Sequence, residues 1–278
     1  MQLRKVANRE LYVRKNLGGS LPSGVGHLLV SVAFNNPKLI KLQAEALRRF
    51  VVDVYTLVVV DNSTDSRHSE ELKLMAVGEG FTYLKAPKNP YSWIDPSLSH
   101  SLALDWAWKQ IVEKVQPATV TLLDHDVFPT QEVALSGILE GAVAAGFKRV
   151  SLGSSRWLLW PGLLMFDYQA VARYRMSFMP RRDTDSGGAL FWNLYSTLPE
   201  SSFRFLKRKE LIFSSDSPRY GDGGSGEFHI FDDIWLHLVD GSGWSDGVEK
   251  MKKLPGGKGN ETLDSLLLLV SGLRHPDS

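Results

Sequence analysis

The feature that most constrains the fold is a short apolar run, Val120 to Leu123, that ends abruptly in Asp124-His125-Asp126. A continuous apolar run of this length is typical of a strand buried on both faces of a parallel sheet. In open α/β sheets, ligands bind beyond the carboxyl ends of the strands. Because Asp124 and Asp126 alternate along an extended chain, their carboxylates can share one face. Two hard oxygen donors there favour Mg²⁺ or Mn²⁺ bound with phosphates, although two solvated loop aspartates would give the same sequence.

Strand and helix patterns alternate through the first half of the chain, as in consecutive βαβ units. The expected strands are residues 27–34, 54–60, 81–84 and 118–123. The expected helices begin at Asn36-Pro37, after 61–65, and after an N-cap at Ser97 or Ser99. The polar residues 1–26, which end in a Gly/Ser/Pro-rich stretch, are interpreted as an arm before this core. The pattern predicts a Rossmann-type α/β fold, with a mostly parallel central sheet flanked by helices.

The pattern becomes irregular beyond residue 130. We expect a helix over 131–145, strands over 149–155 and 157–166, a turn at 183–188 that opens a helix, and a C-terminal amphipathic helix over 261–273. Such irregularity is typical of a substrate-binding region built on a regular scaffold. The chain is therefore interpreted as one domain with a first binding half at 27–130 and a second, substrate-binding half at 131–278.

Composition excludes several classes of protein. The chain has no cysteine, which excludes disulfides, zinc–thiolate sites and thiol nucleophiles. Its formal charge of +1 gives no reason to expect a nucleic-acid partner. The longest aliphatic run, 266–270, is too short to span a bilayer, and no apolar leader is visible at the start. We therefore expect a soluble, cytoplasmic protein without a transmembrane segment, for which peripheral membrane contact remains open.

Several short motifs follow one another in a specific order along the expected elements. They are Asp61-Asn62-Ser63 after the second strand, Asn89-Pro90-Tyr91 after the third, Ser99-His100 in the next helix, and Asp124-His125-Asp126 after the fourth. In this order, over roughly residues 27–245, the chain resembles the GT-A fold of nucleotide-sugar-dependent glycosyltransferases, most like family 2. It departs from that family in the histidine at position 125. It also lacks the Gln/Arg-x-x-Arg-Trp motif of processive synthases, which favours transfer of single sugars.

The resemblance implies a metal-dependent glycosyltransferase, hexosyl or related and inverting. It would move a sugar from a nucleoside-diphosphate sugar to a glycan or other hydroxyl acceptor, with Mn²⁺ or Mg²⁺ as the cofactor. It implies that Asp61 holds the nucleobase or ribose, and that Asp124 and Asp126 match the metal-binding Asp-x-Asp. The remaining candidates for donor binding are Asn35, His100, Asp124 and Ser242.

His237 is the candidate third metal ligand, because a neutral imidazole suits Mn²⁺ and the following Gly-Ser-Gly could approach phosphates. A histidine packed between Trp235 and Leu238 is the alternative, and His229 is the competing ligand. Asp61 could instead form an Asx turn after its strand.

Asp185 is the candidate general base for the acceptor, with Asp183 as the second choice. Both could instead cap a helix. The two glycines at 187 and 188 are expected to leave room for a bulky acceptor. His100 could be a surface or capping histidine, and four aromatic residues could belong either to the core or to a sugar-stacking surface: Trp157, Trp160, Phe166 and Trp192.

Two other functions remain open. One is a phosphatase or phosphotransferase with an Asp-x-Asp nucleophile, although such enzymes carry that motif after the first core strand, whereas about three strands precede it here. The other is a catalytically silent sugar-binding domain.

Overall fold

The structure is a computed structural model that describes residues 9–17, 20–150, 155–181, 184–213, 218–221, 228–238, 264 and 267. Its central sheet has seven strands in the order β3-β2-β1-β4-β7-β6-β8. In chain order these strands are β1 (His27–Ala33), β2 (Tyr55–Asp61), β3 (Thr82–Lys85), β4 (Thr119–Asp124), β6 (Ala144–Val150), β7 (Trp157–Asp167) and β8 (Phe203–Phe205).

The first four strands of the chain are parallel, and β7 is antiparallel to both of its neighbours. The predicted fold class, an α/β protein with a mostly parallel central sheet, is confirmed. The chain runs from β1 outward to β2 and β3, and then returns to place β4 on the other side of β1. The strand order therefore reverses between β1 and β4, which is the point where open α/β sheets bind ligands. Pro161-Gly162 lies within β7, so the strand expected over 157–166 is continuous.

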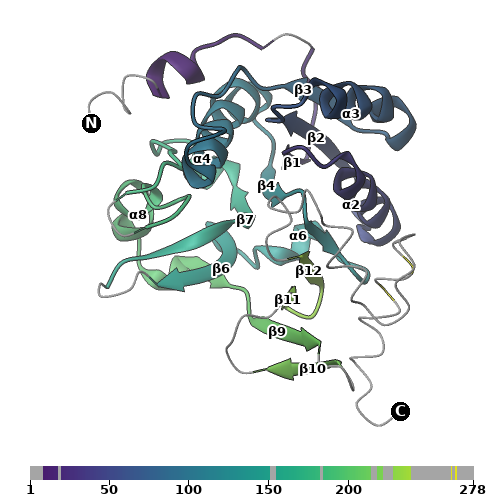
Figure 1. The fold of residues 1–278 in the computed structure, drawn as a ribbon. Coiled ribbons are helices and arrows are strands. Elements are labelled where there is room, and N and C mark those ends of the chain that lie inside the picture. Colours follow the sequence, from purple (N-terminus) through teal and green to yellow (C-terminus); the bar gives the residue numbers. More distant parts are fainter. Residues whose placement is uncertain are drawn as a thin grey trace.

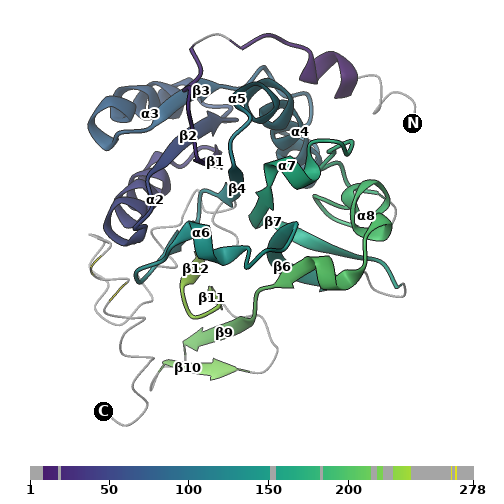
Figure 2. The ribbon, with the colours of Figure 1, turned by 180° about the vertical axis from the view of Figure 1, so that it is seen from behind.

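Helices cover both faces of the sheet (Figure 1). On one face lie α2 (Pro37–Phe50) and α3 (Ser66–Glu79), and on the other lies α4 (Pro96–Ala107), which continues through a π-helical turn, η1 (Trp108–Val112), into α5 (Glu113–Val115) (Figure 2). Side chains of β1 alternate between the two layers. Leu28 and Val30 pack in the core that contains α4, whereas Leu29 packs with Ile40 and Leu47 of α2. This alternation follows from the two-residue period of a strand.

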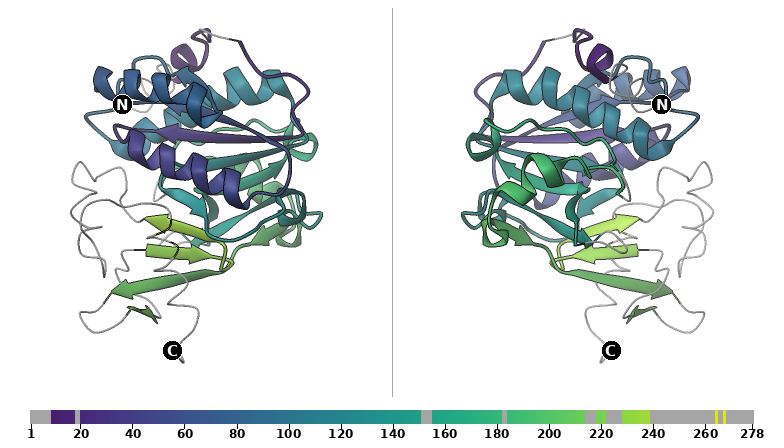
Figure 3. Two further views of the ribbon diagram at one scale, coloured as in Figure 1. Left: turned by 90° about the vertical axis from the view of Figure 1, so that its right-hand side faces the viewer. Right: turned by 90° about the vertical axis from the view of Figure 1, so that its left-hand side faces the viewer.

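A smaller antiparallel sheet lies beside the central one (Figure 3). Its order is β10-β9-β11-β12-β5, with β5 (Val127–Pro129), β9 (Arg208–Phe213), β10 (Pro218–Gly221), β11 (Phe228–Phe231) and β12 (Trp235–Leu238). Apolar side chains of β5, β11 and β12, among them Phe128 and Leu236, pack against Leu39 and Leu42 of α2. Because β5 follows β4 after only two residues, the two sheets meet at His125-Asp126.

The expected helix over 131–145 is wrong. Only α6 (Leu135–Ile138) is helical there, and Ala144 to Val150 form β6. Ala144 pairs with Phe166 on one side and Phe203 on the other, so backbone pairing with distant strands overrides the helix propensity of the local sequence. The remaining short helices are α7 (Tyr168–Val171), α8 (Leu190–Asn193), η2 (Tyr195–Thr197) and η3 (Glu200–Ser202).

The described part of the N-terminal segment packs against α4 and η1. Tyr12 is buried, the indole Nε1–H of Trp106 donates to the Lys15 carbonyl at 3.0 Å, and the Gln110 amide donates to the Val13 carbonyl at 2.6 Å. The arm is thus joined to the core by buried side chains. Of the expected helix over 261–273, only residues 264 and 267 lie within the described part of the chain. Among the helices that the structure describes, none has both the length and the apolar character needed to cross a bilayer.

Candidate functional site

Asn35 joins the loops that follow β1 and β2. Its backbone N–H donates to the Ser63 hydroxyl at 2.9 Å, and its side-chain oxygen accepts the backbone N–H groups of Thr64 at 3.0 Å and Asp65 at 3.2 Å. Asn35 has a φ of 49°, in the left-handed region that asparagine tolerates better than most residues. The predicted donor-binding residue thus shapes the carboxyl edge of the sheet, and a direct contact with the donor stays a prediction.

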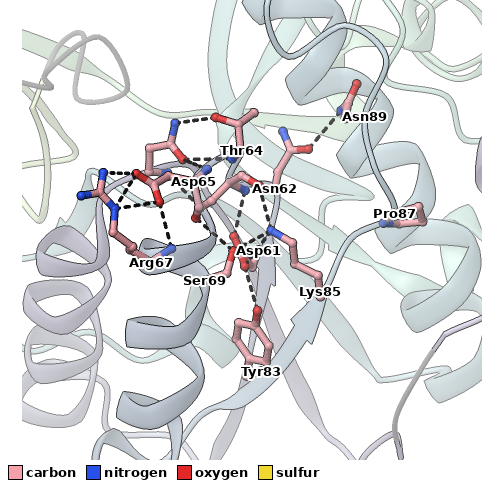
Figure 4. Close-up of polar contacts among 12 residues, drawn as sticks. Asp61, Asn62, Thr64, Asp65, Arg67, Ser69, Tyr83, Lys85, Pro87 and Asn89 are labelled. Carbon is pink, nitrogen blue, oxygen red and sulfur yellow. Dashed lines mark hydrogen bonds and ion pairs between the residues drawn. The ribbon is translucent and has the colours of Figure 1, made fainter.

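Asp61 is fully buried at the end of β2 and is hydrogen-bonded by its own chain (Figure 4). Its carboxylate accepts the Ser63 backbone N–H at 2.8 Å, the Tyr83 hydroxyl at 2.8 Å and the Lys85 ammonium at 2.9 Å. In this arrangement Asp61 orders the loop after β2, and its contact with a nucleobase or ribose stays a prediction. The Ser63 bond is the Asx-type contact that was the alternative interpretation.

Lys85 joins the end of β2, the loop that follows it and the first turn of α3. Besides Asp61, its ammonium donates to the Ser63 carbonyl and the Ser69 hydroxyl, each at 2.8 Å. Burial alone would raise the pKa of Asp61, but hydrogen bonds from Ser63, Ser69 and Lys85 bring it below its ordinary value. The sequence interpretation missed Lys85, although Asp61 and Lys85 are register partners at the ends of β2 and β3.

Replacing Lys85 with methionine is expected to cost about 1–3 kcal/mol of unfolding free energy, because the buried Asp61 loses its cationic partner. The folded pKa of Asp61 lies below its unfolded value, so the stabilisation is present above about pH 4 and is lost as the pH falls through the folded pKa. Denaturant unfolding from pH 3 to pH 7 should therefore show a weaker pH dependence in Lys85→Met than in the wild type. Lys88→Met, at an exposed lysine nearby, is the control, and equal pH profiles for Lys85→Met and the wild type would contradict this account.

The N-terminus of α4 is capped by Asp95, whose carboxylate accepts the Leu98 backbone N–H at 3.0 Å. The expectation that Ser97 or Ser99 is the cap is therefore wrong. A carboxylate one residue before Pro96 reaches the orphan N–H groups of the first turn, which leaves both serine hydroxyls for other contacts.

Ser99 and two asparagines connect this helix to the loop after β2. Asn89 donates from its side-chain amide to the Asn62 side-chain oxygen at 3.0 Å and to the Ser99 carbonyl at 2.8 Å. Asn62 in turn donates to the Ser99 hydroxyl at 3.1 Å. All three residues are buried, so their polar groups are satisfied within the protein and fix α4 against the loop.

His100, in the next position of α4, reaches the end of β4. Its Nε2 lies 2.9 Å from the Asp124 carboxylate, and both side chains are partly exposed. Burial would lower the pKa of His100, but the Asp124 carboxylate raises it above its ordinary value. Burial would likewise raise the pKa of Asp124, and His100 lowers it. The structure thus brings two predicted donor-site residues into contact at the point where the strand order reverses.

Asp126 and His237 lie together on the other side of the turn. The His237 Nε2 is 3.8 Å from the Asp126 carboxylate, and both side chains are largely buried. Burial lowers the pKa of His237 to about 3, so the imidazole is neutral near pH 7. The competing candidate, His229, faces it across β11 and β12, with 3.3 Å between the two Nδ1 atoms. A neutral imidazole is the form of histidine that binds a metal.

The two aspartates and His237 do not form a closed metal site. Within the part of the chain that the structure describes, no group of three or more His, Cys, Asp or Glu side chains is arranged to hold a metal ion. Asp124 is turned toward His100, which leaves Asp126 and His237 as the adjacent pair. Mg²⁺-type sites commonly use one or two carboxylates together with substrate phosphates and waters. The carboxylate of Asp126 and the imidazole of His237 therefore fit an ion that binds together with a diphosphate, rather than one held in a preformed protein cage.

Asp185 is held at the first turn of α4. Its carboxylate accepts the Ser97 hydroxyl at 2.5 Å and the Ser186 backbone N–H at 2.8 Å, and the Arg149 guanidinium donates to it at 3.2 Å. Burial would raise the pKa of Asp185, but these partners lower it. Asp185 does not cap α8, whose N-cap is Ala189, so the capping interpretation is wrong for this residue. The sequence interpretation also missed Arg149.

Asp183 and Ser242, the other two predicted site residues, lie outside the described residues. The turn after Asp185 has a local reason for its glycines: Gly187 has a φ of +87°, and a Cβ on Gly188 would lie 1.8 Å from the Thr184 hydroxyl oxygen. These glycines therefore meet a backbone requirement of the turn, and the room that they would leave for an acceptor stays a prediction.

The four aromatic candidates divide between the core and the site. Phe166 is fully buried, and Trp157 stacks on Tyr195 with 4.9 Å between ring centroids, so both belong to the core. Trp160 lies against His237, with 4.5 Å between ring centroids. Trp192 is 43% exposed. Trp160 is the one of these four that contacts a predicted site residue among the described contacts.

No protein-family model and no curated protein matches the chain. Solved structures of similar shape include the bifunctional glycosyltransferase WbbM in its apo form, with 12% identity, 56% of this chain and 34% of that chain covered, and a TM-score of 0.37. TarS of S. aureus matches with 12% identity over 57% of this chain and 32% of its own, at a TM-score of 0.38. The mannosyltransferase PcManGT from Pyrobaculum calidifontis, solved in complex with GDP-Man and Mn²⁺, matches with 13% identity over 62% of this chain and 53% of its own, at a TM-score of 0.38.

The chain spans between about a third and about half of the length of these three structures. It is thus similar in structure to parts of glycosyltransferases.

Proposed function

We propose that this protein is a metal-dependent glycosyltransferase that moves a sugar from a nucleoside-diphosphate sugar to an acceptor hydroxyl. The observation that carries the proposal is the position of Asp124-His125-Asp126. This turn follows β4 directly beside β1, where the strand order reverses and where open α/β sheets bind nucleotides and other ligands. Carboxylates at that position suit a diphosphate that is accompanied by a divalent cation.

The donor would lie along the carboxyl ends of β1, β2 and β4. We assign its nucleoside to the loops ordered by Asn35 and Asp61, which meet through Ser63. His100 and Asp124 would lie beside the diphosphate, and Ser242 completes the predicted set. Because buried hydrogen bonds fix the loop after β2 to α4, and Asn35 joins the loop after β1 to it, a donor would meet a preorganised surface.

Asp126 and His237 would hold Mn²⁺ or Mg²⁺, with Asp124 beside them. When bound, the ion would neutralise the charge that develops on the diphosphate leaving group. The protein supplies the fixed spacing of Asp126 and His237, because β5 and β12 pair in a register that places Val127 opposite His237. His237 enters this role without having to lose a proton near pH 7, since burial keeps it neutral.

Asp185 would accept the proton of the attacking acceptor hydroxyl, and Asp183 is the second choice for that role. A base is needed in an inverting reaction, which is the stereochemical course that we propose. The lowered pKa of Asp185 keeps its carboxylate ionised near pH 7, which is the state that a base requires. The acceptor hydroxyl would replace one of the contacts that Ser97 and Arg149 now make with this carboxylate.

Replacing Asp126 with asparagine tests the donor site. Isothermal calorimetry with UDP, GDP, dTDP and CMP, each with and without Mn²⁺, should show Mn²⁺-dependent binding of one nucleotide to the wild type. We expect Asp126→Asn to weaken it by at least about 10-fold, because even the loss of an outer-shell partner costs about 10–100-fold in metal affinity. Asp167→Asn is the matched control, since Asp167 caps α7 and pairs with Thr119, at the opposite end of β4 from Asp124. Unchanged Mn²⁺-dependent binding in Asp126→Asn would remove the basis of the assignment.

The product that the wild-type protein releases from the donor distinguishes the alternative functions. An Asp-x-Asp phosphatase or phosphotransferase carries its nucleophile after the first core strand, whereas this motif ends β4, the fourth strand in chain order. Release of a nucleoside diphosphate from the donor would support glycosyl transfer, and release of phosphate would support the phosphatase. Donor binding without any turnover in the presence of Mn²⁺ would support a silent sugar-binding domain.

A further inference from the structure

We infer that Gln43 is the positioning residue of the Asp124–Asp126 turn: its side-chain amide, reaching from α2, fixes the backbone on both sides of His125-Asp126. The inference rests on the proposed function, because it assigns to Gln43 the task of presenting the two aspartates to the donor and its metal ion.

Gln43 bridges the two ends of the turn. Its Nε2 donates to the Asp124 carbonyl at 2.8 Å and to the Val127 carbonyl at 2.6 Å. The amide group of a glutamine carries two N–H donors in one plane. A single glutamine can therefore donate to two carbonyls that lie on either side of a turn. Asp124 is the last residue of β4 and Val127 the first of β5, so this one side chain spans the whole break between the strands.

The position of Gln43 has no other evident explanation. The residue is fully buried, and its neighbours on α2, Ile40, Ala44 and Leu47, all pack in the apolar core. A buried amide costs stability unless it is hydrogen-bonded, so an apolar side chain would serve the packing of the helix better. The two carbonyls account for the side-chain N–H groups at this position, whereas the side-chain oxygen has no hydrogen-bond partner among the described residues.

The other contacts of the turn come from different directions. The Nδ1 of His125 lies 3.1 Å from the Val32 carbonyl of β1, and the Leu238 backbone N–H of β12 donates to the Asp126 carbonyl at 3.0 Å. Gln43 adds the contacts from α2. Since Asp124 faces His100 and Asp126 faces His237, the directions of both carboxylates depend on the backbone that Gln43 holds. A small misplacement of such groups is costly to binding and rate.

The experiment compares Gln43→Met with Gln110→Met. Methionine has a similar length and helix propensity and removes both donors. Gln110 is the matched control, because it is also a buried glutamine that donates to a backbone carbonyl, that of Val13, away from the turn. Hydrogen exchange followed by mass spectrometry, without metal or nucleotide, measures the exchange rate of backbone amides in peptides that cover 124–129. Calorimetry measures the Mn²⁺-dependent affinity for the nucleotide that the wild type binds.

We expect exchange in 124–129 to be about tenfold faster in Gln43→Met, the factor that corresponds to the loss of one or two net hydrogen bonds. Mn²⁺-dependent nucleotide affinity should fall by about 10–100-fold, as for other residues that orient metal ligands. Gln110→Met should change neither quantity. Wild-type exchange and affinity in Gln43→Met, or an equal effect of Gln110→Met on the same peptides, would overturn the inference.

Gln43→Asn is the second variant, in case Gln43→Met does not fold. It keeps an amide but is one methylene shorter, so it cannot reach both carbonyls. Exchange in 124–129 should again be faster and Mn²⁺-dependent nucleotide affinity lower, each to a smaller degree. Wild-type values in this variant would also overturn the inference. Failure of the proposed function is recognised separately. If the wild type binds no nucleotide with Mn²⁺, the proposed function fails, while the exchange measurement still decides whether Gln43 holds the turn.

Discussion

Replacing Asp185 with asparagine is expected to slow sugar transfer by about 10²–10⁴-fold, the usual contribution of a general base. The variant loses the carboxylate that would accept the proton of the acceptor. It keeps a side-chain oxygen that can still accept hydrogen bonds from Ser97 and Ser186, so the turn and the first helical turn of α4 should stay in place. Mn²⁺-dependent binding of the nucleotide should therefore match the wild type.

The measurement pairs initial rates of transfer, followed by release of the nucleoside diphosphate, with calorimetry of donor binding. Asp233→Asn is the control, because Asp233 is an exposed aspartate that forms an ion pair with Lys209. A transfer rate within a few-fold of the wild type in Asp185→Asn would show that the base lies elsewhere, with Asp183 the next candidate, or that the enzyme retains configuration and needs no such base.

The second large effect concerns stability. Replacing Arg9 with methionine is expected to lower the unfolding free energy by about 3–5 kcal/mol, as when one partner of a buried ion pair is removed. The Asp105 side chain is fully buried in α4, and the Arg9 guanidinium donates to it. The Asp105 carboxylate also accepts hydrogen bonds from the Phe178 backbone N–H at 2.6 Å and from the Ser177 hydroxyl at 3.3 Å. Without Arg9, these two neutral donors would face a buried negative charge.

Denaturant unfolding of the single and double variants measures the pair. Asp105→Asn added to Arg9→Met removes the stranded charge while it keeps an acceptor for Phe178, so the double variant should recover part of the lost stability. Arg14→Met, at an exposed arginine of the same segment, is the control. A loss below about 1 kcal/mol in Arg9→Met would class the pair with surface ion pairs and contradict its structural role.

The sequence predicted best those parts of the fold that depend on local pattern. The strands that end at Asp61 and Asp124 are apolar runs whose burial follows from composition alone, and their order implies parallel pairing. The segment around Ala144 was predicted wrongly, because its conformation is decided by pairing with strands that are distant in the chain. Short-range propensity carries no information about such pairing.

The candidate site divides in the same way. His100 and Asp124 could be placed at one edge of the sheet from strand and helix order, and they lie 2.9 Å apart. Lys85 could have been found from the register of two adjacent parallel strands, since it ends β3 beside Asp61. Gln43 and Arg149 could not, because their contacts depend on how a helix crosses the sheet and on where a misassigned strand ends.

The junction of the two sheets at Asp126 has a mechanical consequence. Asp126 continues from the central sheet, and His237 belongs to β12 of the smaller one. The two sheets are joined by an apolar layer on α2 and by β5, which continues the chain from β4 and pairs with β12. If these two side chains share one ion with the donor, they become a cross-link between two otherwise separately hydrogen-bonded layers. When the donor and the ion are bound, the smaller sheet would then resist unfolding ahead of the central sheet. Its resistance to unfolding would therefore report whether the site is occupied.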